Sequence, residues 1–429
     1  MTTDSEFLDA LETRGADARE AALFAALPAH LGAAVRAAPA LADRLAGHDL
    51  ASVTTRAALA RLPVLRKSEL LEQQRSARRA GGDALGGHAA VGWGSARPPA
   101  ERAGKVFASP GPIYEPEART ADAWRMARAL HAAGFRAGDL VHNAFSYHFT
   151  PAGSMMESGA LALGCTVFPA GTGQTEQQLQ ALADLRPDAY VGTPSFLRIL
   201  LDKADEAGLA LPALRKASVG GEGFPPSLRD RFAARGIEAV QSYGTADLGL
   251  VAYETRAREG LVLDEHVIVE IVRPGTGEPV PEGEVGEVVV TPLSAAYPLV
   301  RFGTGDLSAI LPGACPTGRT APRIRGWLGR ADQSAKVRGL FVHPAQVAEI
   351  ARRHPELVRL RLVVSGADAD DRLLLRAETA GAAPEGLAAQ VVQAVRDITK
   401  LRAEVELVPA GTLPNDGKVI DDARPPPAA

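Results

Sequence analysis

The chain has few cysteines, no long apolar run and little excess charge, and each shortage bears on a class of protein. Its 429 residues include only Cys165 and Cys315, far apart and in no CxxC spacing, so we expect no disulfide framework and a reducing compartment. No uninterrupted apolar segment is long enough to span a bilayer. The formal net charge of −4 gives no support for general nucleic-acid binding. We therefore expect a cytoplasmic protein with neither a membrane nor a nucleic acid as partner.

What is present is typical of a large globular enzyme or binding protein. Hydrophobic residues make up 46% and charged residues 23%, and the length is sufficient for more than one domain. The first twenty residues contain no basic segment followed by an apolar run, so we expect no signal peptide. The basic stretch 75–79 is interpreted as a solvated helix face, and residues 76–102 are predicted to form a loop.

Strand and helix patterns alternate regularly in the middle of the chain. Strands are predicted at 139–145, 166–170, 188–193, 216–222 and 239–244, with helical patterns between them. Such alternation indicates βαβ units and a parallel sheet. Beyond Glu254, short strand patterns separated by Pro/Gly turns predict an antiparallel or barrel-like subdomain. We predict an α/β protein with a large N-terminal domain (1–329), a hinge (330–338) and a small α+β domain (339–429).

Two glycine-bearing turns fall at the carboxyl ends of predicted parallel strands, where open α/β sheets bind ligands. They are Gly220–Gly223 and Tyr243–Asp247. Glycine lets a ring or a phosphate approach the backbone closely, and Asp247 supplies a hard oxygen ligand for Mg²⁺ beside phosphates. Each turn alone is weak evidence, because glycines that only close tight βα turns explain it better.

Further polar residues follow in the C-terminal third. Asp306, after a glycine turn, is placed to accept hydrogen bonds from ribose hydroxyls, and Lys418 follows an Asn-Asp-Gly turn. The segment 329–339 is a dense polar stretch suited to a hinge and to phosphate contacts. It offers four charged side chains: Arg330, Asp332, Lys336 and Arg338. Taken singly, each of these is also compatible with a solvated turn residue.

The order of these segments is more specific than any one of them. GGEG, YGTAD, TGDL, GRADQSAKVRG and a terminal GK follow one another in a chain that resembles the adenylate-forming (acyl-CoA synthetase) superfamily. SYGTADLGLVAYE (242–254), VGTPSF (191–196) and GLFVHPAQV (339–347) look most like phenylacetate–CoA ligases. The resemblance spans roughly residues 107–424. It implies a mobile C-terminal domain, a small carboxylic acid substrate, the cofactors ATP, Mg²⁺ and coenzyme A, and a homodimer.

The resemblance also implies roles for individual residues at the nucleotide. Gly221, Glu222 and Gly223 would line the adenine site, while Tyr243, Gly244 and Thr245 would close over the adenylate. Asp247 stands where the family usually has a Mg²⁺-binding Glu, and Ala246 where a hydroxyl residue is common. Asp306 and Arg330 would hold the ribose.

Other implied roles concern the acid, the acceptor and the small domain. Lys418 would reach the carboxylate and the α-phosphate, and Asp332 would be the hinge. Lys336, Arg338 and Gly339 would face the active site when the acyl acceptor attacks. Tyr147, His148 and Phe149 would line the acid pocket, although residues of this segment are also compatible with ordinary sheet core.

Two departures from the family pattern stand out. FASPGPIYEPE (107–117) occupies the place of a flexible phosphate loop, between a predicted strand and a helical pattern at 118–133, but it has three prolines and no lysine. Ser109, Gly111 and Tyr114 would remain for triphosphate, or the prolines form a rigid turn and pyrophosphate is held elsewhere. The resemblance implies that some relatives hold a structural zinc where this chain has Thr255, Val262, Cys315 and Thr317, so we predict no zinc site.

Three functions stay open at this point. The first is an AMP-forming ligase that transfers an aryl or small acyl group to coenzyme A. The second transfers that group to an amine or to a carrier-protein thiol. The third is a degenerate homologue that binds a nucleotide or acyl ligand without turnover, which the altered loop and Ala246 favour, whereas the presence of Lys418 favours the first two.

Overall fold

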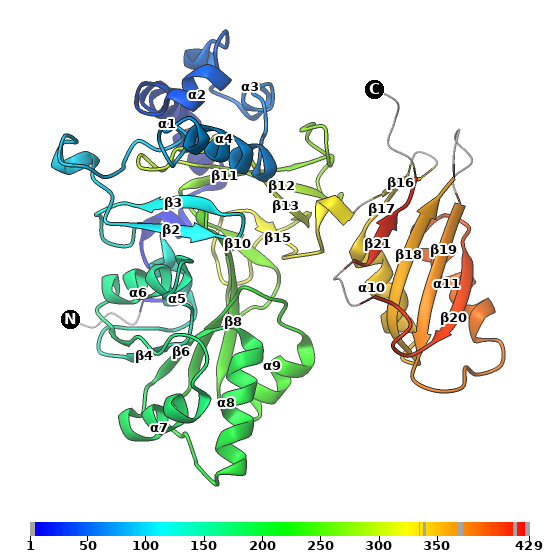
Figure 1. The fold of residues 1–429 in the computed structure, drawn as a ribbon. Coiled ribbons are helices and arrows are strands. Elements are labelled where there is room, and N and C mark those ends of the chain that lie inside the picture. The colour runs from blue at the N-terminus through cyan, green and yellow to red at the C-terminus, as the bar shows by residue number, and fades with distance from the viewer. Residues whose placement is uncertain (1–4, 334, 338–339, 367–371, 415–417, 425–429) are drawn as a thin grey trace. The chain divides into compact units, whose positions relative to one another are not determined.

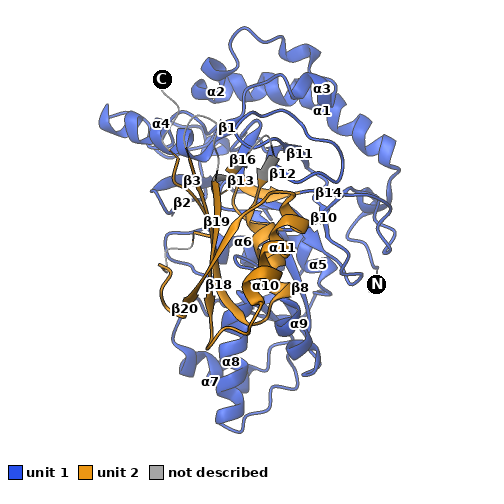
Figure 2. Ribbon diagram, turned by 90° about the vertical axis from the view of Figure 1, so that its right-hand side faces the viewer, with its two compact units in different colours: residues 1–304, 309–326 blue, residues 305–308, 327–429 orange. Residues whose placement is uncertain are grey.

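The computed structural model describes residues 5–333, 335–337, 340–366, 372–414 and 418–424. The chain divides into two compact units, which Figure 2 shows in different colours. Unit 1 comprises residues 1–304 and 309–326, and unit 2 comprises residues 305–308 and 327–429. Each unit is described by itself. Across the described ranges, no helix has the length and apolar character needed to cross a bilayer.

Unit 1 contains a nine-stranded sheet with the strand order β14-β15-β10-β9-β8-β7-β6-β4-β5 (Figure 1). Neighbouring strands among β5, β4, β6, β7 and β8 pair in parallel, and those from β8 to β14 pair antiparallel. The parallel strands are β4 (Leu140–Asn143), β5 (Thr166–Phe168), β6 (Ala189–Gly192), β7 (Lys216–Val219) and β8 (Glu238–Thr245). The remaining strands are β9 (Gly249–Glu254), β10 (Leu261–Leu263), β14 (Ile310–Leu311) and β15 (Arg323–Ile324).

Helices cover both faces of the parallel part, as βαβ connections require. They are α5 (Met126–Ala132), α6 (Ala152–Ala162), α7 (Thr175–Leu185), α8 (Pro194–Glu206) and α9 (Pro226–Ala233). Helices α5 and α6 share one hydrophobic cluster with the sheet, and α8 and α9 share another. Helix α8 begins where it does because Thr193 caps it, accepting the N–H of Phe196, and Pro194 occupies the first turn.

A second sheet has the strand order β1-β13-β12-β11, and all of its residues except the last four of β13 belong to unit 1. Its strands are β1 (Leu65–Arg66), β11 (Val267–Val272), β12 (Gly286–Pro292) and β13 (Phe302–Ser308). Strand β13 begins only at Phe302, after Pro298, which has no N–H to donate to a ladder. The N-terminal elements are η1 (Ala10–Thr13), α1 (Ala16–Ala37), α2 (Pro39–Arg44), η2 (Leu50–Ser52) and α3 (Arg56–Leu59). Helix α1 packs on this sheet through Leu27, Leu31 and Ile268.

The segment FASPGPIYEPE forms a β-hairpin, not a turn between a strand and a helix as expected. Strands β2 (Lys105–Ser109) and β3 (Ile113–Glu117) pair antiparallel, with Ser109 opposite Ile113. The next helix, α5, begins at Met126 because both carboxylate oxygens of Asp122 accept N–H groups of its first turn. Helix α4 (Lys67–Arg79) packs beside the hairpin. Because this helix continues to Arg79, the loop expected to begin at Ser76 begins after that residue. The short helix η3 (Pro99–Glu101) lies within the expected loop.

Unit 2 is a small α+β unit. Its four-stranded sheet has the order β20-β19-β18-β21, with the central pair antiparallel and the outer pairs parallel. The strands are β18 (Leu357–Ser365), β19 (Arg372–Thr379), β20 (Glu404–Pro409) and β21 (Ile420–Asp422). Helices α10 (Pro344–Arg353) and α11 (Leu387–Thr399) pack on it, and η4 (Ala331–Gln333), β16 (Ala335–Val337) and β17 (Leu340–Val342) precede them. The predicted fold class, a parallel α/β sheet followed by a small α+β unit, is confirmed.

Candidate nucleotide and acid site

The two glycine-bearing turns lie next to each other at one edge of the parallel sheet. Strands β7 and β8 pair in parallel, so the turn after β7 meets the end of β8. A Cβ on Gly220 would lie 3.1 Å from the backbone oxygen of Ser242, which shows how closely the two segments approach. Gly221 has a φ of +79°, and the backbone at Gly223 is exposed. The structure therefore brings the predicted adenine and adenylate segments together.

Hydrogen bonds and close backbone contacts hold the residues at this edge, which include Glu222 and Tyr243–Thr245. Glu222 is exposed and its Oε1 accepts the N–H of Ser195, at the start of α8, at 2.6 Å. Gly244 must be glycine, since a Cβ there would lie 2.7 Å from the carbonyl oxygen of Gly249. The hydroxyl of Thr245 accepts the N–H of Leu248. These contacts fix the turn that leads into Asp247.

Asp247 is buried and only half satisfied. Its side chain is 1% exposed, and its Oδ2 receives a hydrogen bond from Lys67 Nζ at 2.9 Å. Its Oδ1 has no hydrogen-bond partner among the described residues. A buried carboxylate oxygen without a partner costs free energy unless a cation or donor reaches it. This orphaned oxygen fits a Mg²⁺ ion, which proteins hold by one or two carboxylates together with substrate phosphates.

Lys67 was not predicted from the sequence. It is the first residue of α4, 180 positions from Asp247, and no local pattern marks it. The contact between Lys67 and Asp247 depends on the fold, because it joins residues that are far apart in the sequence.

The hairpin residues expected to bind triphosphate are engaged within the protein. The Ser109 N–H donates to Glu115 Oε2 at 3.2 Å, and its hydroxyl donates to Glu115 Oε1. The Gly111 carbonyl accepts from Arg75 Nη2 at 2.6 Å, and the Tyr114 backbone makes two hydrogen bonds to the Gln74 side chain. The hairpin is therefore a stiff element whose Ser109 donors point inward.

Glu115 itself is fully buried, and burial raises the pKa of its carboxyl group to about 7. The negative charge of Asp247 adds to the increase, while the hydrogen bond from Ser109 and the charge of Lys67 oppose it. Near neutral pH this carboxyl group can lose or gain a proton. Its interaction with Asp247 and Lys67 also places the hairpin beside the predicted Mg²⁺ ligand.

The predicted ribose residues lie together in unit 2. Arg330 Nη1 is 3.2 Å from Asp306 Oδ1, and the indole N–H of Trp327 donates to the same oxygen at 3.1 Å. The Arg330 guanidinium also covers Gly305, where a Cβ would lie 2.5 Å from Nη2. The sequence prediction named both partners of this ion pair but not Trp327.

The other predicted residues of unit 2 are dispersed along it. The Lys418 side chain is 55% exposed, and its Nζ lies 3.3 Å from Asp421 Oδ1. The backbone of Asp332 lies in η4 and that of Lys336 in β16. Arg338 and Gly339 fall outside the residues that the structure describes.

The predicted acid-pocket residues differ in exposure. Tyr147 is half-buried, its hydroxyl accepts from Asn143 Nδ2 at 2.8 Å, and burial raises its pKa above the ordinary value. His148 is exposed, and Phe149 is 80% exposed with a φ of +61°.

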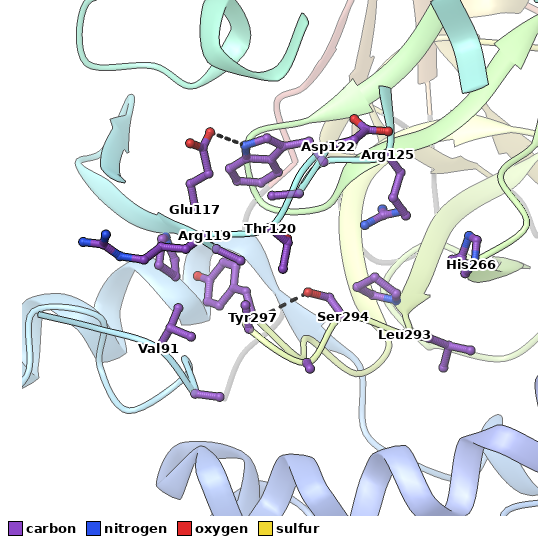
Figure 3. A pocket seen from close by; sticks show the side chains of 18 of the residues that line it. Val91, Glu117, Arg119, Thr120, Asp122, Arg125, His266, Leu293, Ser294 and Tyr297 are labelled. Atoms are coloured by element: carbon purple, nitrogen blue, oxygen red, sulfur yellow. Dashed lines mark hydrogen bonds between the residues drawn. The ribbon is translucent and has the colours of Figure 1, made fainter. Parts of the chain in front are cut away.

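A separate cavity of about 710 Å³ lies in unit 1 between the residues after β3 and the loop before β13 (Figure 3). Asp247, Glu117, Trp124 and Tyr297 line it. The Trp124 N–H donates to Glu117 Oε2 at 2.7 Å, which orients the indole in the wall. Tyr147, His148 and Phe149 are not among the lining residues, so this cavity and the predicted acid pocket are distinct places in unit 1.

Of the four positions compared with a zinc site, Cys315 carries the one cysteine, and it is buried. Cys165 and Cys315 are both free thiols, and Cys315 Sγ lies 3.1 Å from Thr317 Oγ1. In the part of the chain that the structure describes, no three His, Cys, Asp or Glu side chains are grouped to hold a metal ion.

Comparison with known proteins identifies the proteins that this chain resembles. Residues 118–292 match the family described as AMP-binding enzyme. The chain is 36% identical to a phenylacetate-coenzyme A ligase of Aromatoleum evansii over 274 residues, 60% of this chain and 62% of that one. It is 36% identical to a phenylacetate-coenzyme A ligase of Thermus thermophilus over 241 residues, 54% of each chain. The chain thus spans only 62% and 54% of the lengths of these curated relatives.

A solved structure resembles more of the chain. An open conformation of 2-hydroxyisobutyryl-CoA ligase, in complex with 2-HIB-AMP and CoA, matches with a TM-score of 0.84 and 25% identity. The match covers 98% of this chain and 95% of that one. Together, the sequence relatives and this structure confirm that the chain is similar to phenylacetate–CoA ligases of the adenylate-forming superfamily.

Proposed function

We propose that the protein activates an aryl or small carboxylic acid with ATP and passes the acyl group to coenzyme A. The observation that carries this proposal is the edge of the parallel sheet, where the Gly220–Gly223 turn, the end of β8 and the half-satisfied Asp247 meet. Glycines there admit a planar base, and a buried carboxylate suits a cation bound to phosphates. The family and structural similarities support the same reaction class.

The first step is an attack of the substrate carboxylate oxygen on the α-phosphorus of ATP. One C–O–P bond forms, the bond to the β-phosphate oxygen breaks, and pyrophosphate leaves with its electron pair. In the second step the coenzyme A thiol, on losing its proton, attacks the acyl carbon, so a thioester forms and AMP leaves. Lys418 would approach the carboxylate and α-phosphate in the first step, because anions that meet need a neighbouring cation.

Asp247 would hold Mg²⁺, and the ion would supply charge neutralisation at the phosphates. Lys67 now occupies one oxygen of Asp247, so the ion and the ammonium group would share that carboxylate. Asp306 and Arg330 would hold the ribose, with Trp327 fixing the Asp306 carboxylate.

The remaining assignments extend the resemblance. Gly221–Gly223 and Tyr243–Thr245 would surround the adenine, and Tyr147, His148 and Phe149 would border the acid. Asp332 would act as the hinge between domains at 1–329 and 339–429, with Lys336, Arg338 and Gly339 turned toward the acceptor in the second step. Two buried free thiols support a cytoplasmic location, and the resemblance supports a homodimer.

A non-catalytic binder is the second candidate, and one observation favours it. Both hydrogen-bond donors of Ser109 are used by Glu115, so the hairpin offers fewer donors to a triphosphate than a flexible phosphate loop would.

Product analysis separates the two candidates. The purified protein is incubated with ATP, Mg²⁺, coenzyme A and a panel of aryl and short-chain acids, and AMP and acyl-CoA are measured. The ligase predicts AMP formation that depends on one acid and is lost in Asp247→Asn. AMP without thioester, converted to an amide when amines are added, would indicate the other acceptor. A folded protein that binds AMP but forms none with any acid would contradict the ligase.

A further inference from the structure

The chain lacks a lysine in its hairpin, yet helix α4 brings two arginines to the tip of that hairpin. Arg75 Nη2 donates to the Gly111 carbonyl at 2.6 Å, and Arg78 Nη2 lies 3.5 Å from the Pro112 carbonyl. The Arg78 guanidinium lies 5.0 Å from the centre of the Tyr114 ring, a cation–π distance. Both arginines therefore border the turn that replaces the phosphate loop.

Within the described part of the chain, no ion pair neutralises the positive charge of either arginine. Among the described residues, neither guanidinium has a carboxylate within ion-pair distance, whereas Arg79 on the same helix pairs with Glu72 at 3.7 Å. The buried carboxylates of Glu115 and Asp247 have other partners. Glu115 is buried against Ser109, and Asp247 pairs with Lys67. An arginine has five N–H donors, so one or two bonds to neutral carbonyls leave donors for an anion.

The hairpin itself offers little to a phosphate. Pro110 and Pro112 have no N–H, the Ser109 donors serve Glu115, and the Tyr114 N–H donates to Gln74. At the tip of this turn, the carbonyl oxygens of Gly111 and Pro112 face the arginines, so the guanidinium groups are the charged donors that a polyphosphate would meet there. Guanidinium groups bind phosphate oxygens in pairs, which makes them suitable replacements for a loop lysine.

We propose that Arg75 and Arg78 bind the β- and γ-phosphates of ATP, and hence pyrophosphate, in place of donors from the loop. The inference rests on the proposed function for its ligand. It reverses the sequence interpretation of 75–79 as a merely solvated helix face. Because AMP has only the α-phosphate, these arginines distinguish ATP and pyrophosphate from AMP.

Calorimetric titration with ATP, pyrophosphate and AMP tests the proposal on the full chain. The double variant Arg75→Gln/Arg78→Gln keeps amide donors for the turn carbonyls but removes both charges. Its affinity for ATP and pyrophosphate should fall at least about 10-fold, since each hydrogen bond from a charged group contributes appreciably. Its affinity for AMP should stay unchanged. Arg79→Gln is the matched control on the same helix and should change none of the three.

Charge-preserving Arg75→Lys/Arg78→Lys should recover a large part of the ATP affinity, and this variant keeps the test decisive if the glutamine variant fails to fold. Equal losses for ATP and AMP, or an ATP affinity no weaker than in Arg79→Gln, would overturn the inference while leaving the proposed function standing. A wild-type protein that binds neither ATP nor AMP would overturn both.

Discussion

Glu115 is a carboxyl group with no exposed surface, placed between a serine and a second buried acid. Burial, with the Asp247 charge as the second cause, raises its pKa from 4.5 to about 7. At pH values between 4.5 and about 7, the folded protein therefore binds more protons at this residue than the unfolded chain does. Stability from this residue is therefore fully present below about pH 4.5 and is lost as the pH rises through about 7.

We expect Glu115→Gln to remove this dependence, because a neutral carboxamide can still accept from Ser109. Relative to wild type, the variant should gain unfolding free energy between pH 5 and pH 8, by at most about 3 kcal/mol at 1.36 kcal/mol per pKa unit. Urea unfolding at the two pH values measures this. The exposed Glu72→Gln serves as control. If the wild-type and Glu115→Gln profiles were parallel, the assignment of a raised pKa would be wrong.

Single residues could be predicted only where a motif names them. Asp306 and Arg330 were predicted as a pair with one role, and the structure joins them at 3.2 Å. The inward orientation of Ser109 could not be foreseen, because it depends on the hairpin register that places Ser109 and Glu115 on one face. No sequence motif marked Lys67 or Trp327 as part of the site.

At the scale of elements, a buried glutamine of α4 holds the hairpin at Tyr114. Gln74 is fully buried; its Nε2 donates to the Tyr114 carbonyl at 2.9 Å, and its Oε1 accepts the Tyr114 N–H at 2.8 Å. This side chain satisfies both backbone groups of one strand residue, as a neighbouring strand would. The position of Arg75 and Arg78 beside the turn depends on the same docking.

Gln74→Ala should therefore loosen the hairpin more than the rest of unit 1. Two backbone groups lose their partners, and each costs about 1–3 kcal/mol if it stays buried. We expect a loss of about 2–4 kcal/mol, with faster amide hydrogen exchange confined mainly to residues 105–117. Glu72→Ala, an exposed position of α4, should leave exchange unchanged. Exchange that rises evenly over unit 1 would argue against a locally docked hairpin.

Elements with a strong local period were predictable, and the hairpin was not. The small α+β domain was predicted at 339–429, and helices α10 and α11 lie within it. FASPGPIYEPE contains prolines that suggest a turn leading into a helix, and an extended second strand with Pro116 inside it has little strand signal. Its pairing with β2 and its contact with α4 decide the structure.

At the scale of the whole molecule, the N-terminal segment completes the interior of unit 1. Glu12 has no exposed surface, and its two oxygens lie 2.7 Å from Arg128 Nη1 and 2.8 Å from Arg319 Nε. These partners lie 116 residues or more along the chain. Sequence patterns describe neighbours along the chain, so the acidic N-terminus gave no hint of this buried network.

Glu12→Ala should remove the buried negative charge that pairs with the buried Arg128 and Arg319. Breaking a buried pair from one side costs about 3–5 kcal/mol, because the remaining charges are uncompensated. Glu6→Ala is the matched control, since Glu6 pairs with the exposed Arg256 and should cost less than about 1 kcal/mol. Chemical denaturation compares the two. Equal effects would show that the Glu12 network adds little to stability.

The central claim, that this protein forms an acyl-adenylate, is tested most directly by ATP–pyrophosphate exchange across a panel of aryl and short-chain acids. Wild-type protein should exchange label in the presence of one acid and not without it. Lys418→Ala, at an exposed side chain whose loss should leave unit 2 folded, should reduce that exchange by at least about 100-fold, as removal of a group that stabilises the reacting charges does. Exchange that is absent with every acid, or unaffected in Lys418→Ala, would contradict the account.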